Sequence, residues 1–223
     1  MAMTEEGSVS RFKAVIFDMD GVLVDSEPVY LGMVRDCLAR HGCPRPLKAY
    51  DHLAGGSRQD FVSCVMDSLH VGRRRAFLIF AVYALSHPVD YTALVRPQAQ
   101  ALTARLAGAG LRLAVASSSS KRAIGQMLAA GGMDGLFELT VSGYDFKHSK
   151  PDPEIYEVTV RRLGLDKADV AVVEDSTRGI QAAKAAGLFT IALRDSRYAF
   201  QPQLADVQID SLDQAAGIII PGR

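Results

Sequence analysis

Two aspartates stand at the end of a short apolar run near the start of the chain. Asp18 and Asp20 follow "FKAVIF" at residues 12–17, and Gly21 comes directly after them. One carboxylate of such a pair can act as a nucleophile while the other carries a proton, and a glycine lets the backbone bend tightly around a bound group. An aspartate after a strand is more often a turn former or a helix cap, so the pair alone identifies no site.

Further polar residues end or follow apolar runs later in the chain. Ser117 ends "LRLAVAS", Lys150 lies in "HSKPDPE", and Glu174 and Asp175 end "VAVVED". Carboxylates can hold a hard cation through oxygen, and that cation together with Lys150 would neutralise a phosphoryl group. Ser117 and the amides that follow it, beginning at Ser118, can bond phosphate oxygens. Each has a simpler interpretation, because "ASSSSK" also suits a helix start and a lysine is usually solvated.

The elements that would position these residues follow from the apolar pattern. Five short runs are rich in β-branched residues and apolar on both faces, as buried parallel strands are: 12–17, 111–117, 136–142, 170–175 and 188–193. Helical patterns that end at glycines alternate with them: 98–107, 121–130, 153–163 and the segment capped by Ser176. This order predicts an α/β fold with a Rossmann-like, doubly wound parallel sheet, whose ligand site lies beyond the carboxyl ends of the strands.

One long segment breaks the alternation of strands and helices. It contains three helical patterns, from Ser26 to Gly42, after the capping pair Ser57 and Asp60, and over 73–86. The segment is too long for a loop, so we expect it to form a small helical cap domain inserted into the sheet domain. The predicted division is a core of residues 1–25 and 91–223 and a cap of residues 26–90.

Composition narrows the classes of partner. Lysine plus arginine and aspartate plus glutamate each total 25, so no net positive charge exists to attract nucleic acid or an anionic membrane. The apolar run at 76–85 is half of the roughly 20 residues that span a bilayer, and the amino terminus lacks a signal-peptide core, which predicts a cytosolic protein. Three cysteines without a C-x-x-C pair indicate free thiols rather than disulfides or a zinc site.

Four stretches taken together carry a family resemblance. "DMDGVLVDS", "VASSSS", "SKPDPEIY" and "VVEDSTRGIQAAKAAG" occur in this order and cover the chain. They resemble the motifs of the haloacid dehalogenase superfamily, which consists mainly of phosphatases and phosphomutases. The resemblance implies that Asp18 is the nucleophile that becomes an aspartyl phosphate. It implies that Asp20 protonates the leaving group and later activates water.

The same resemblance implies a phosphoryl site and a metal site. Ser117 and Lys150 would hold the phosphoryl group. Mg²⁺ would be bound by the carboxylate of Asp18, the backbone carbonyl of Asp20 and the carboxylate of Asp175. Glu174 would lie beside the ion, either as a ligand or behind one.

The inserted helices narrow the subfamily. They resemble the small helical cap of β-phosphoglucomutase, phosphoglycolate phosphatase and sugar-phosphate phosphatases. Within the cap, "LAGGSRQD" at 53–60 is similar to the segment of β-phosphoglucomutase that contacts substrate, with Arg58 at the position of its second-phosphate ligand. The simpler alternative is that Arg58 is a solvated residue in the first turn of a helix.

Three features favour hydrolysis over phosphoryl transfer between sugar positions, and the first is "DSEP" at 25–28, a form common among the phosphatases of the superfamily. Tyr30 stands where the mutase carries a histidine, and no lysine occurs between Lys48 and Lys121 to match its cap lysine. We therefore expect a Mg²⁺-dependent, monomeric phosphatase that acts on a small phosphorylated metabolite, most simply a sugar phosphate. A phosphomutase is the second hypothesis. A catalytically silent phosphometabolite-binding protein is the third, and the presence of both Asp18 and Asp20 argues against it.

Overall fold

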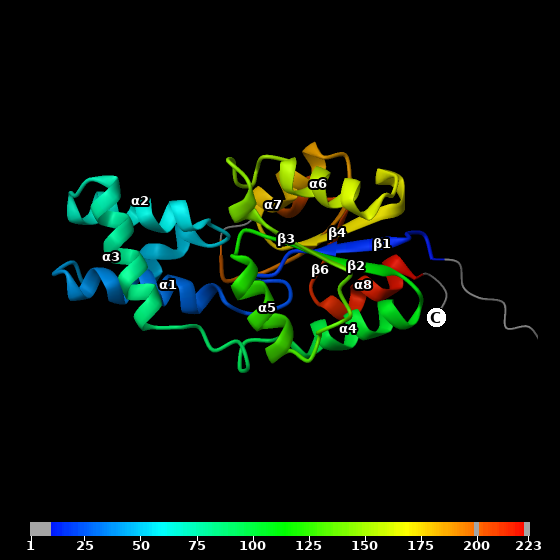
Figure 1. Cartoon of the computed structure of the whole chain (residues 1–223), viewed down its shortest axis with the longest axis horizontal. Helices are drawn as coiled ribbons and strands as arrows, with labels where there is room; N and C mark the ends of the chain where they lie inside the picture. Colours follow the sequence, from blue (N-terminus) through cyan, green and yellow to red (C-terminus); the bar gives the residue numbers. More distant parts are fainter. Residues whose placement is uncertain (1–9, 199–200, 221–223) are drawn as a thin grey trace, which may run out of the picture.

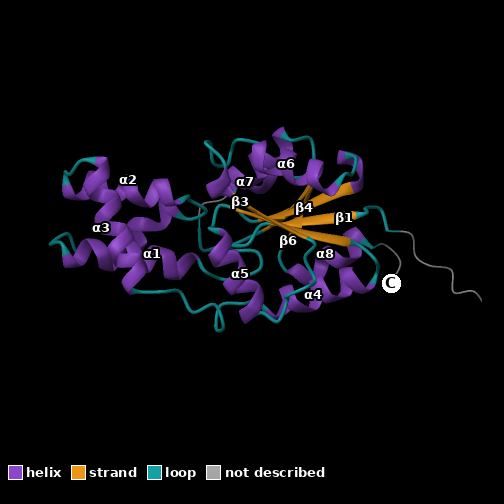
Figure 2. Ribbon diagram, viewed as in Figure 1, coloured by secondary structure: helices purple, strands orange, loops and turns teal. Residues whose placement is uncertain are grey.

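A computed structural model of the chain describes residues 10–198 and 201–220, which form a sheet covered by helices and a bundle of helices beside it (Figure 1). All neighbouring strands in the sheet are parallel, in the order β3-β2-β1-β4-β5-β6. Helices cover both of its faces (Figure 2). The predicted Rossmann-like, doubly wound α/β fold is therefore confirmed.

The five predicted strands are present, shortened by up to three residues at one end. Their bounds are β1 Ala14–Phe17, β2 Arg112–Ser117, β3 Leu139–Ser142, β4 Val170–Glu174 and β5 Phe189–Leu193. A sixth strand, β6 Val207–Ile209, was not predicted. Among the described residues it pairs with β5 alone, and one of its three residues is buried, so its sequence contains no apolar run to reveal it.

Alternate side chains of β1 enter two separate apolar layers. Val15 and Phe17 pack on the face covered by α4 Pro97–Gly108, α5 Lys121–Ala130 and α8 Leu212–Ile219. Ala14 and Ile16 pack on the face covered by α6 Glu154–Leu163 and α7 Thr177–Ala185. Helix α8 was not predicted, because it has only eight residues and contains a glycine. β1 is buried on both faces, which fixes the strand that carries Asp18.

The bundle consists of three helices (Figure 1), and a short 3₁₀ helix at Leu47–Leu53 contributes Tyr50 and Leu53 to its apolar cluster. These are α1 Glu27–Arg40, α2 Arg58–Leu69 and α3 Arg73–Ser86. They share an apolar cluster that contains no residue of the two sheet layers, with Val34, Val65 and Phe80 among its members. The three cysteines also lie here, as free thiols, and Cys37 is buried. This separate cluster supports our proposal that residues 26–90 form a cap domain.

The two segments that join cap and core run side by side. Val24 and Val95 form an antiparallel bridge, and the amide of Asp25 donates to the carbonyl of Leu94 at 2.8 Å. Within the described ranges, no helix has both the length and the apolar character needed to cross a membrane. The first nine residues, which bear on the prediction about a signal peptide, lie outside these ranges.

Candidate active site

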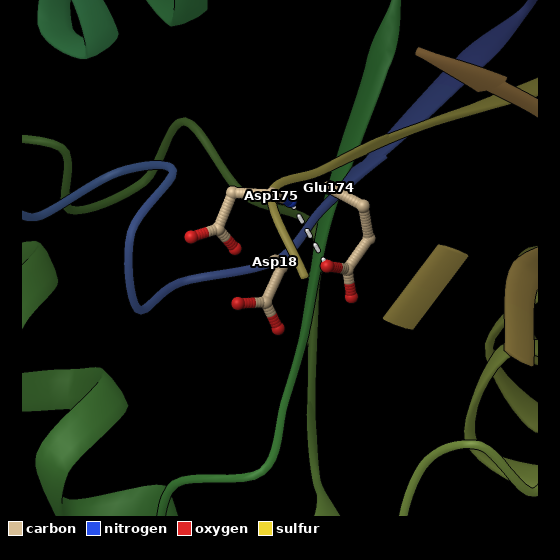
Figure 3. Close-up of side chains that lie close together, drawn as sticks. All are labelled: Asp18, Glu174 and Asp175. Carbon is tan, nitrogen blue, oxygen red and sulfur yellow. Dashed lines mark hydrogen bonds between the residues drawn. The ribbon is translucent and has the colours of Figure 1, made fainter. Parts of the chain in front are cut away.

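The carboxyl edge of the sheet gathers the residues that the sequence singled out. Asp18 directly follows β1, which lies between β2 and β4. Ser117 ends β2, Glu174 ends β4, and Asp175 directly follows that strand. Figure 3 shows the carboxylates of Asp18, Glu174 and Asp175 close together, and one oxygen from each lies within 4.8 Å of the others. Residues far apart in the sequence thus meet because parallel strands end at one edge.

Lys150 joins two of these carboxylates. Its Nζ donates to Asp18 Oδ1 and to Glu174 Oε1, each at 2.6 Å, and to the carbonyl of Ala116 at 3.1 Å. Its side chain is only 6% exposed. Burial alone would lower the pKa of Lys150, but the charges of Asp18 and Glu174 raise it well above its ordinary value. The ammonium group therefore stays protonated beside the predicted nucleophile.

Both carboxylate oxygens of Glu174 accept hydrogen bonds from neighbouring groups. Its Oε1 accepts from Lys150 and from the hydroxyl of Tyr156 at 2.6 Å, and its Oε2 accepts from the amides of Asp175 and Ser176 and from the Ser176 hydroxyl. Burial would raise the pKa of Glu174, but Lys150 and these donors lower it. A side chain at Gly179 is excluded, because its Cβ would lie 1.8 Å from Glu174 Oε1. These contacts favour a role in positioning Lys150 over metal ligation.

Negative charge exceeds positive charge at this edge. Burial raises the pKa of Asp18 and of Asp175, and the charge of Glu174 adds to both shifts, while Lys150 opposes them. A cation bound here would favour the ionised carboxylates. The donors are carboxylate oxygens without a histidine or cysteine among them, which fits a hard cation such as Mg²⁺. Gly21 is needed for this arrangement, since its φ is +84° and a Cβ there would lie 1.8 Å from Asp175 Oδ2.

Two hydroxyl groups hold the carboxylate of Asp20. Ser26, at the entry to α1, donates to Oδ1 at 2.6 Å, and Ser119, in the loop after β2, donates to Oδ2 at 2.7 Å. Sequence reasoning assigned neither serine to Asp20, because Ser26 suggested only a helix cap. Burial raises the pKa of Asp20, and the two hydroxyl donors oppose the shift. A raised pKa suits a carboxyl group that carries a proton.

The serines at 117–120, which end β2 and form the loop after it (the serine loop), have two different roles. Ser120 caps α5 by accepting from the amide of Ala123 at 3.2 Å, which accounts for the helix-start pattern in "ASSSSK". Ser117 is buried at the strand end, and its Oγ accepts from the amide of Ser119 at 3.0 Å. Ser118 lines two neighbouring cavities. Ser117 and Ser118 are thus available at the carboxyl edge, because the cap of α5 uses neither.

A cavity of about 510 Å³ lies between the helical bundle and the serine loop. Asp20 and Tyr30 line it, together with Arg58 at the first position of α2. The Arg58 guanidinium lies 4.3 Å from the ring centre of Phe77 on α3 and 5.7 Å from that of Tyr144 on the core. A second cavity, of about 840 Å³, also borders Arg58. Arg58 therefore faces space that a ligand can occupy.

Glu27, the first residue of α1, is a cavity residue that sequence reasoning did not identify. It is 5% exposed, and its Oε1 accepts from the amide of Gly55 at 3.1 Å. Its Oε2 is buried and has no hydrogen-bond partner among the described residues. Burial raises the pKa of Glu27 to about 7, with contributions from the charges of Asp20 and Asp195, although Gly55 and Arg197 act in the opposite direction. Glu27 belongs to "DSEP", a form that resembles the phosphatases of the superfamily, but sequence reasoning gave the residue no role of its own.

Replacing Glu27 with glutamine is expected to stabilise the protein increasingly as the pH rises. The pKa of Glu27 rises on folding from 4.5 to about 7. Its ionisation therefore does not affect the free energy of unfolding at a pH where it is protonated in both the folded and the unfolded state, and lowers that free energy most at a pH above both pKa values. Between pH 5.5 and pH 8.5, the advantage of Glu27→Gln should grow by about 2 kcal/mol. Urea unfolding in the presence of a chelator measures it. Glu154→Gln, at the exposed start of α6, serves as the control and should show no such growth. A gain in the stability of Glu27→Gln that is the same at every pH would contradict the raised pKa of Glu27.

Comparisons with known proteins show which family the chain belongs to. The sequence profile of the haloacid dehalogenase-like hydrolase family matches residues 12–187. The "Phosphorylated carbohydrates phosphatase" of Thermotoga maritima is 30% identical over 178 residues, which are 79% of this chain and 82% of that protein. "Hexitol phosphatase B" of Escherichia coli K12 is 30% identical over 208 residues, 90% of this chain and 93% of that protein.

A solved structure shows the same fold. The β-phosphoglucomutase of Clostridium difficile superposes with a TM-score of 0.75 at 22% identity, covering 91% of this chain and 92% of that one. The family profile spans most of this chain, and its range includes the ends of β1, β2 and β4, where Asp18, Ser117 and Glu174 lie. The chain therefore belongs to the haloacid dehalogenase-like hydrolase family.

Proposed function

We propose that this enzyme is a Mg²⁺-dependent phosphatase that hydrolyses a small sugar phosphate through an aspartyl-phosphate intermediate, as a monomer in the cytosol. The observation that carries the proposal is the buried pairing of Asp18 with Lys150 beside an Asp20 that two hydroxyl groups hold in place. Relatives that span most of the chain and are named as phosphatases of phosphorylated carbohydrates and hexitols support it.

The reaction uses groups that lie together at the strand ends. A carboxylate oxygen of Asp18 attacks phosphorus, the bond from phosphorus to the ester oxygen breaks, and Asp20 gives its proton to the departing oxygen. Water then attacks the aspartyl phosphate, Asp20 takes a proton from that water, and inorganic phosphate leaves. Lys150, Ser117 and Ser118 hold the phosphoryl oxygens, so the transferring group stays in line with Asp18.

The metal site in this proposal consists of Asp18, the backbone carbonyl of Asp20 and Asp175. A bound Mg²⁺ would supply positive charge against the phosphoryl oxygens. Asp175 is suited to the site because Gly21 leaves room for its carboxylate and burial makes an unneutralised charge costly. Glu174 lies behind this group and orients Lys150.

Asp175→Ala is expected to weaken metal affinity more than substrate affinity. Loss of one carboxylate from a three-oxygen site should raise the Mg²⁺ concentration for half-maximal rate by roughly 10-fold to 100-fold. Titration of activity with Mg²⁺ at several substrate concentrations separates the two affinities. Asp210→Ala removes an exposed strand-end aspartate beyond β6 and should change neither. Full activity of the unmodified enzyme in excess chelator would refute the metal requirement.

A phosphate-release screen tests the function as a whole. Sugar phosphates, hexitol phosphates, phosphoglycolate and nucleotides are offered with Mg²⁺, with and without catalytic glucose 1,6-bisphosphate. We expect release of inorganic phosphate from sugar esters in both conditions. Isomerised sugar phosphate that appears only with the bisphosphate would establish the mutase, which the structural likeness to β-phosphoglucomutase keeps as the second candidate. If the protein binds phosphate esters but hydrolyses and isomerises none of them, it is a catalytically silent phosphometabolite-binding protein.

Arg58→Ala is expected to change specificity rather than basic chemistry. If Arg58 bonds the distal part of the substrate, its removal should lower kcat/KM for the preferred sugar phosphate by about 10-fold to 100-fold. The small ester p-nitrophenyl phosphate does not reach the cap and should be little affected. Arg75→Ala removes an exposed arginine of α3 that does not line either cavity, and it should change neither rate. An equal loss of kcat/KM on both esters would mean that Arg58 supports the structure or the closing of the cap over the core rather than substrate recognition.

A further inference from the structure

Arg178, in the first turn of α7, contacts the cap and the core at the same time. Its Nη1 donates to Asp60 Oδ2 in the cap at 2.6 Å, and its Nε donates to the carbonyl of Lys150 at 2.9 Å. It lies within "VVEDSTRGIQAAKAAG", where the family resemblance gave it no role. One guanidinium group thus joins a cap side chain to the main chain of the lysine that pairs with Asp18.

Helix α7 does not itself need a cation at this position. Its N-cap is Ser176, whose hydroxyl accepts from the amide of Gly179 at 3.0 Å. The start of a helix carries partial positive charge, so the helix dipole repels an arginine in the first turn, and no acidic residue of that turn compensates. The reason for Arg178 must therefore lie in its contacts outside α7.

Asp60 links Arg178 to the cap segment that carries Arg58. Its Oδ2 also accepts from the amide of Ser57 at 2.6 Å and from the Ser57 hydroxyl at 2.7 Å, and these bonds begin α2. Burial alone would raise the pKa of Asp60, but the bonds from Ser57 and the charge of Arg178 lower it, so Asp60 pairs with Arg178 as an anion. Because Arg58 lies between Ser57 and Asp60 in the sequence, a contact that holds Asp60 also holds the start of the helix that presents Arg58.

The cap loop before α2 lies against the same end of α7. Gly55 has a φ of +69°, and a Cβ there would lie 2.7 Å from the Cβ of Ser176. Tyr198, in the core loop after β5, packs against the apolar cluster of the cap. The contact of Arg178 with the cap is therefore accompanied by other close contacts between cap and core.

We propose that Arg178 is a positioning residue that seats the cap on the core through Asp60 and the carbonyl of Lys150. In this role it brings Arg58 of the cap and Lys150 of the core to the two ends of one substrate. Arg178 itself touches neither the substrate nor the reacting atoms. The consequence for the reaction rests on the proposed phosphatase activity, whereas the seating of the cap is measurable without any substrate.

The competing role of Arg178 is local. Its bond to the carbonyl of Lys150 would then support that backbone alone, and the pair with Asp60 would have no effect on the cap. The side chains of Arg178 and Asp60 are 36% and 34% exposed, and ion pairs with such exposure often contribute little. The local role predicts that Asp60→Asn leaves the cap in place and that Arg178→Gln acts in the same way whatever residue stands at position 60.

A fluorescent reporter measures the seating of the cap. The chain contains no tryptophan, so Tyr198→Trp places a single one on the core, against the cap cluster. Arg178→Gln or Asp60→Asn is then added, and quenching by acrylamide is measured on the Mg²⁺-loaded full chain without substrate. Either substitution should raise the quenching constant by about twofold or more, because the unseated cap leaves the ring exposed. Asparagine can still accept from Ser57, so Asp60→Asn keeps the start of α2.

The same helix supplies a matched control. Lys184 on α7 pairs with Asp206 at 2.6 Å, and each of these side chains is 33% exposed. This pair lies within the core, so Lys184→Gln removes a cation of similar surroundings without touching the cap. It should change neither the quenching of the reporter nor the rate of hydrolysis.

Kinetics test the consequence for the reaction. Arg178→Gln and Asp60→Asn should each lower kcat/KM for the preferred sugar phosphate by about threefold to tenfold. The double variant should lose little more than either single variant, because both substitutions break the same contact. If the losses multiply instead, Arg178 acts without Asp60 and the proposed role is wrong.

The outcomes distinguish this inference from the function on which its kinetic part rests. If the unmodified enzyme hydrolyses no phosphate ester, including p-nitrophenyl phosphate, the phosphatase function fails, while the reporter still tests the seating of the cap. If neither Arg178→Gln nor Asp60→Asn changes the quenching, the seating role is overturned, whatever the rates. Urea unfolding of each variant establishes that it is folded, and Asp60→Asn tests the contact from the cap side should Arg178→Gln unfold.

Discussion

Asp18→Asn is expected to lose hydrolysis of every phosphate ester, by a factor of about 10⁴ or more, because an amide is nearly isosteric with the carboxylate but is a very poor nucleophile. The loss should be the same for a sugar phosphate and for p-nitrophenyl phosphate, since the attack on phosphorus is common to both. Lys150 keeps an acceptor at position 18, because the amide oxygen can take the place of Asp18 Oδ1.

Stability of this variant should change little. The substitution removes attraction between Asp18 and Lys150, but it also removes the cost of burying the charge and its repulsion from Glu174 and Asp20. Phosphate release with Mg²⁺ measures the activity, and urea unfolding measures the stability. Asp210→Asn changes an exposed strand-end aspartate in the same way and should retain full activity. Retention of more than a few per cent of activity by Asp18→Asn would rule out an aspartyl-phosphate mechanism.

Part of this site could be predicted from the sequence because its residues lie at the ends of strands. A buried parallel strand is an uninterrupted apolar run, so a polar residue that stops the run marks the carboxyl edge of the sheet. Asp18, Ser117 and Glu174 were found in this way, and the structure places them at the carboxyl ends of three adjacent strands. The cap followed from the length of the insertion and from the pairing of Ser57 with Asp60, where the Ser57 amide donates to Asp60 Oδ2 at 2.6 Å.

The groups that orient these residues could not be predicted in the same way. Tyr156 points its hydroxyl at Glu174 from a helix where it occupies an ordinary apolar position, and Ser119 reaches Asp20 across 99 positions of sequence. Such contacts depend on side-chain directions after the chain has folded, and periodicity says only which face is buried. Glu27 was missed because its surroundings depend on how the cap packs against the core, where it borders cavities that Asp20 and Asp175 also line.

Lys150→Met is expected to lower both activity and stability strongly. The lysine is 6% exposed and is the cation that pairs with Asp18 and Glu174, so its removal leaves two buried carboxylates without their partner. Breaking a buried pair in this way costs about 3 to 5 kcal/mol. The rate should fall by roughly a thousandfold, because the phosphoryl group loses a fixed positive charge. Lys13→Met breaks the exposed pair with Asp169 at 2.8 Å and should change stability little, because solvent screens that pair.

A second substitution separates the structural effect of Lys150 from its effect on the reaction. In the unmodified protein, Glu174→Gln weakens the contact with Lys150 and should lower the free energy of unfolding. In the Lys150→Met background, the same substitution removes a buried charge that no longer faces a cation, so it should raise the free energy of unfolding. Urea unfolding of the four proteins in chelator tests this reversal of sign. The double variant should nevertheless stay as inactive as Lys150→Met, because neutralising Glu174 places no positive charge beside the phosphoryl oxygens. Recovery of activity together with stability would mean that Lys150 serves only to neutralise Glu174, and the phosphoryl-binding role assigned to it would be wrong.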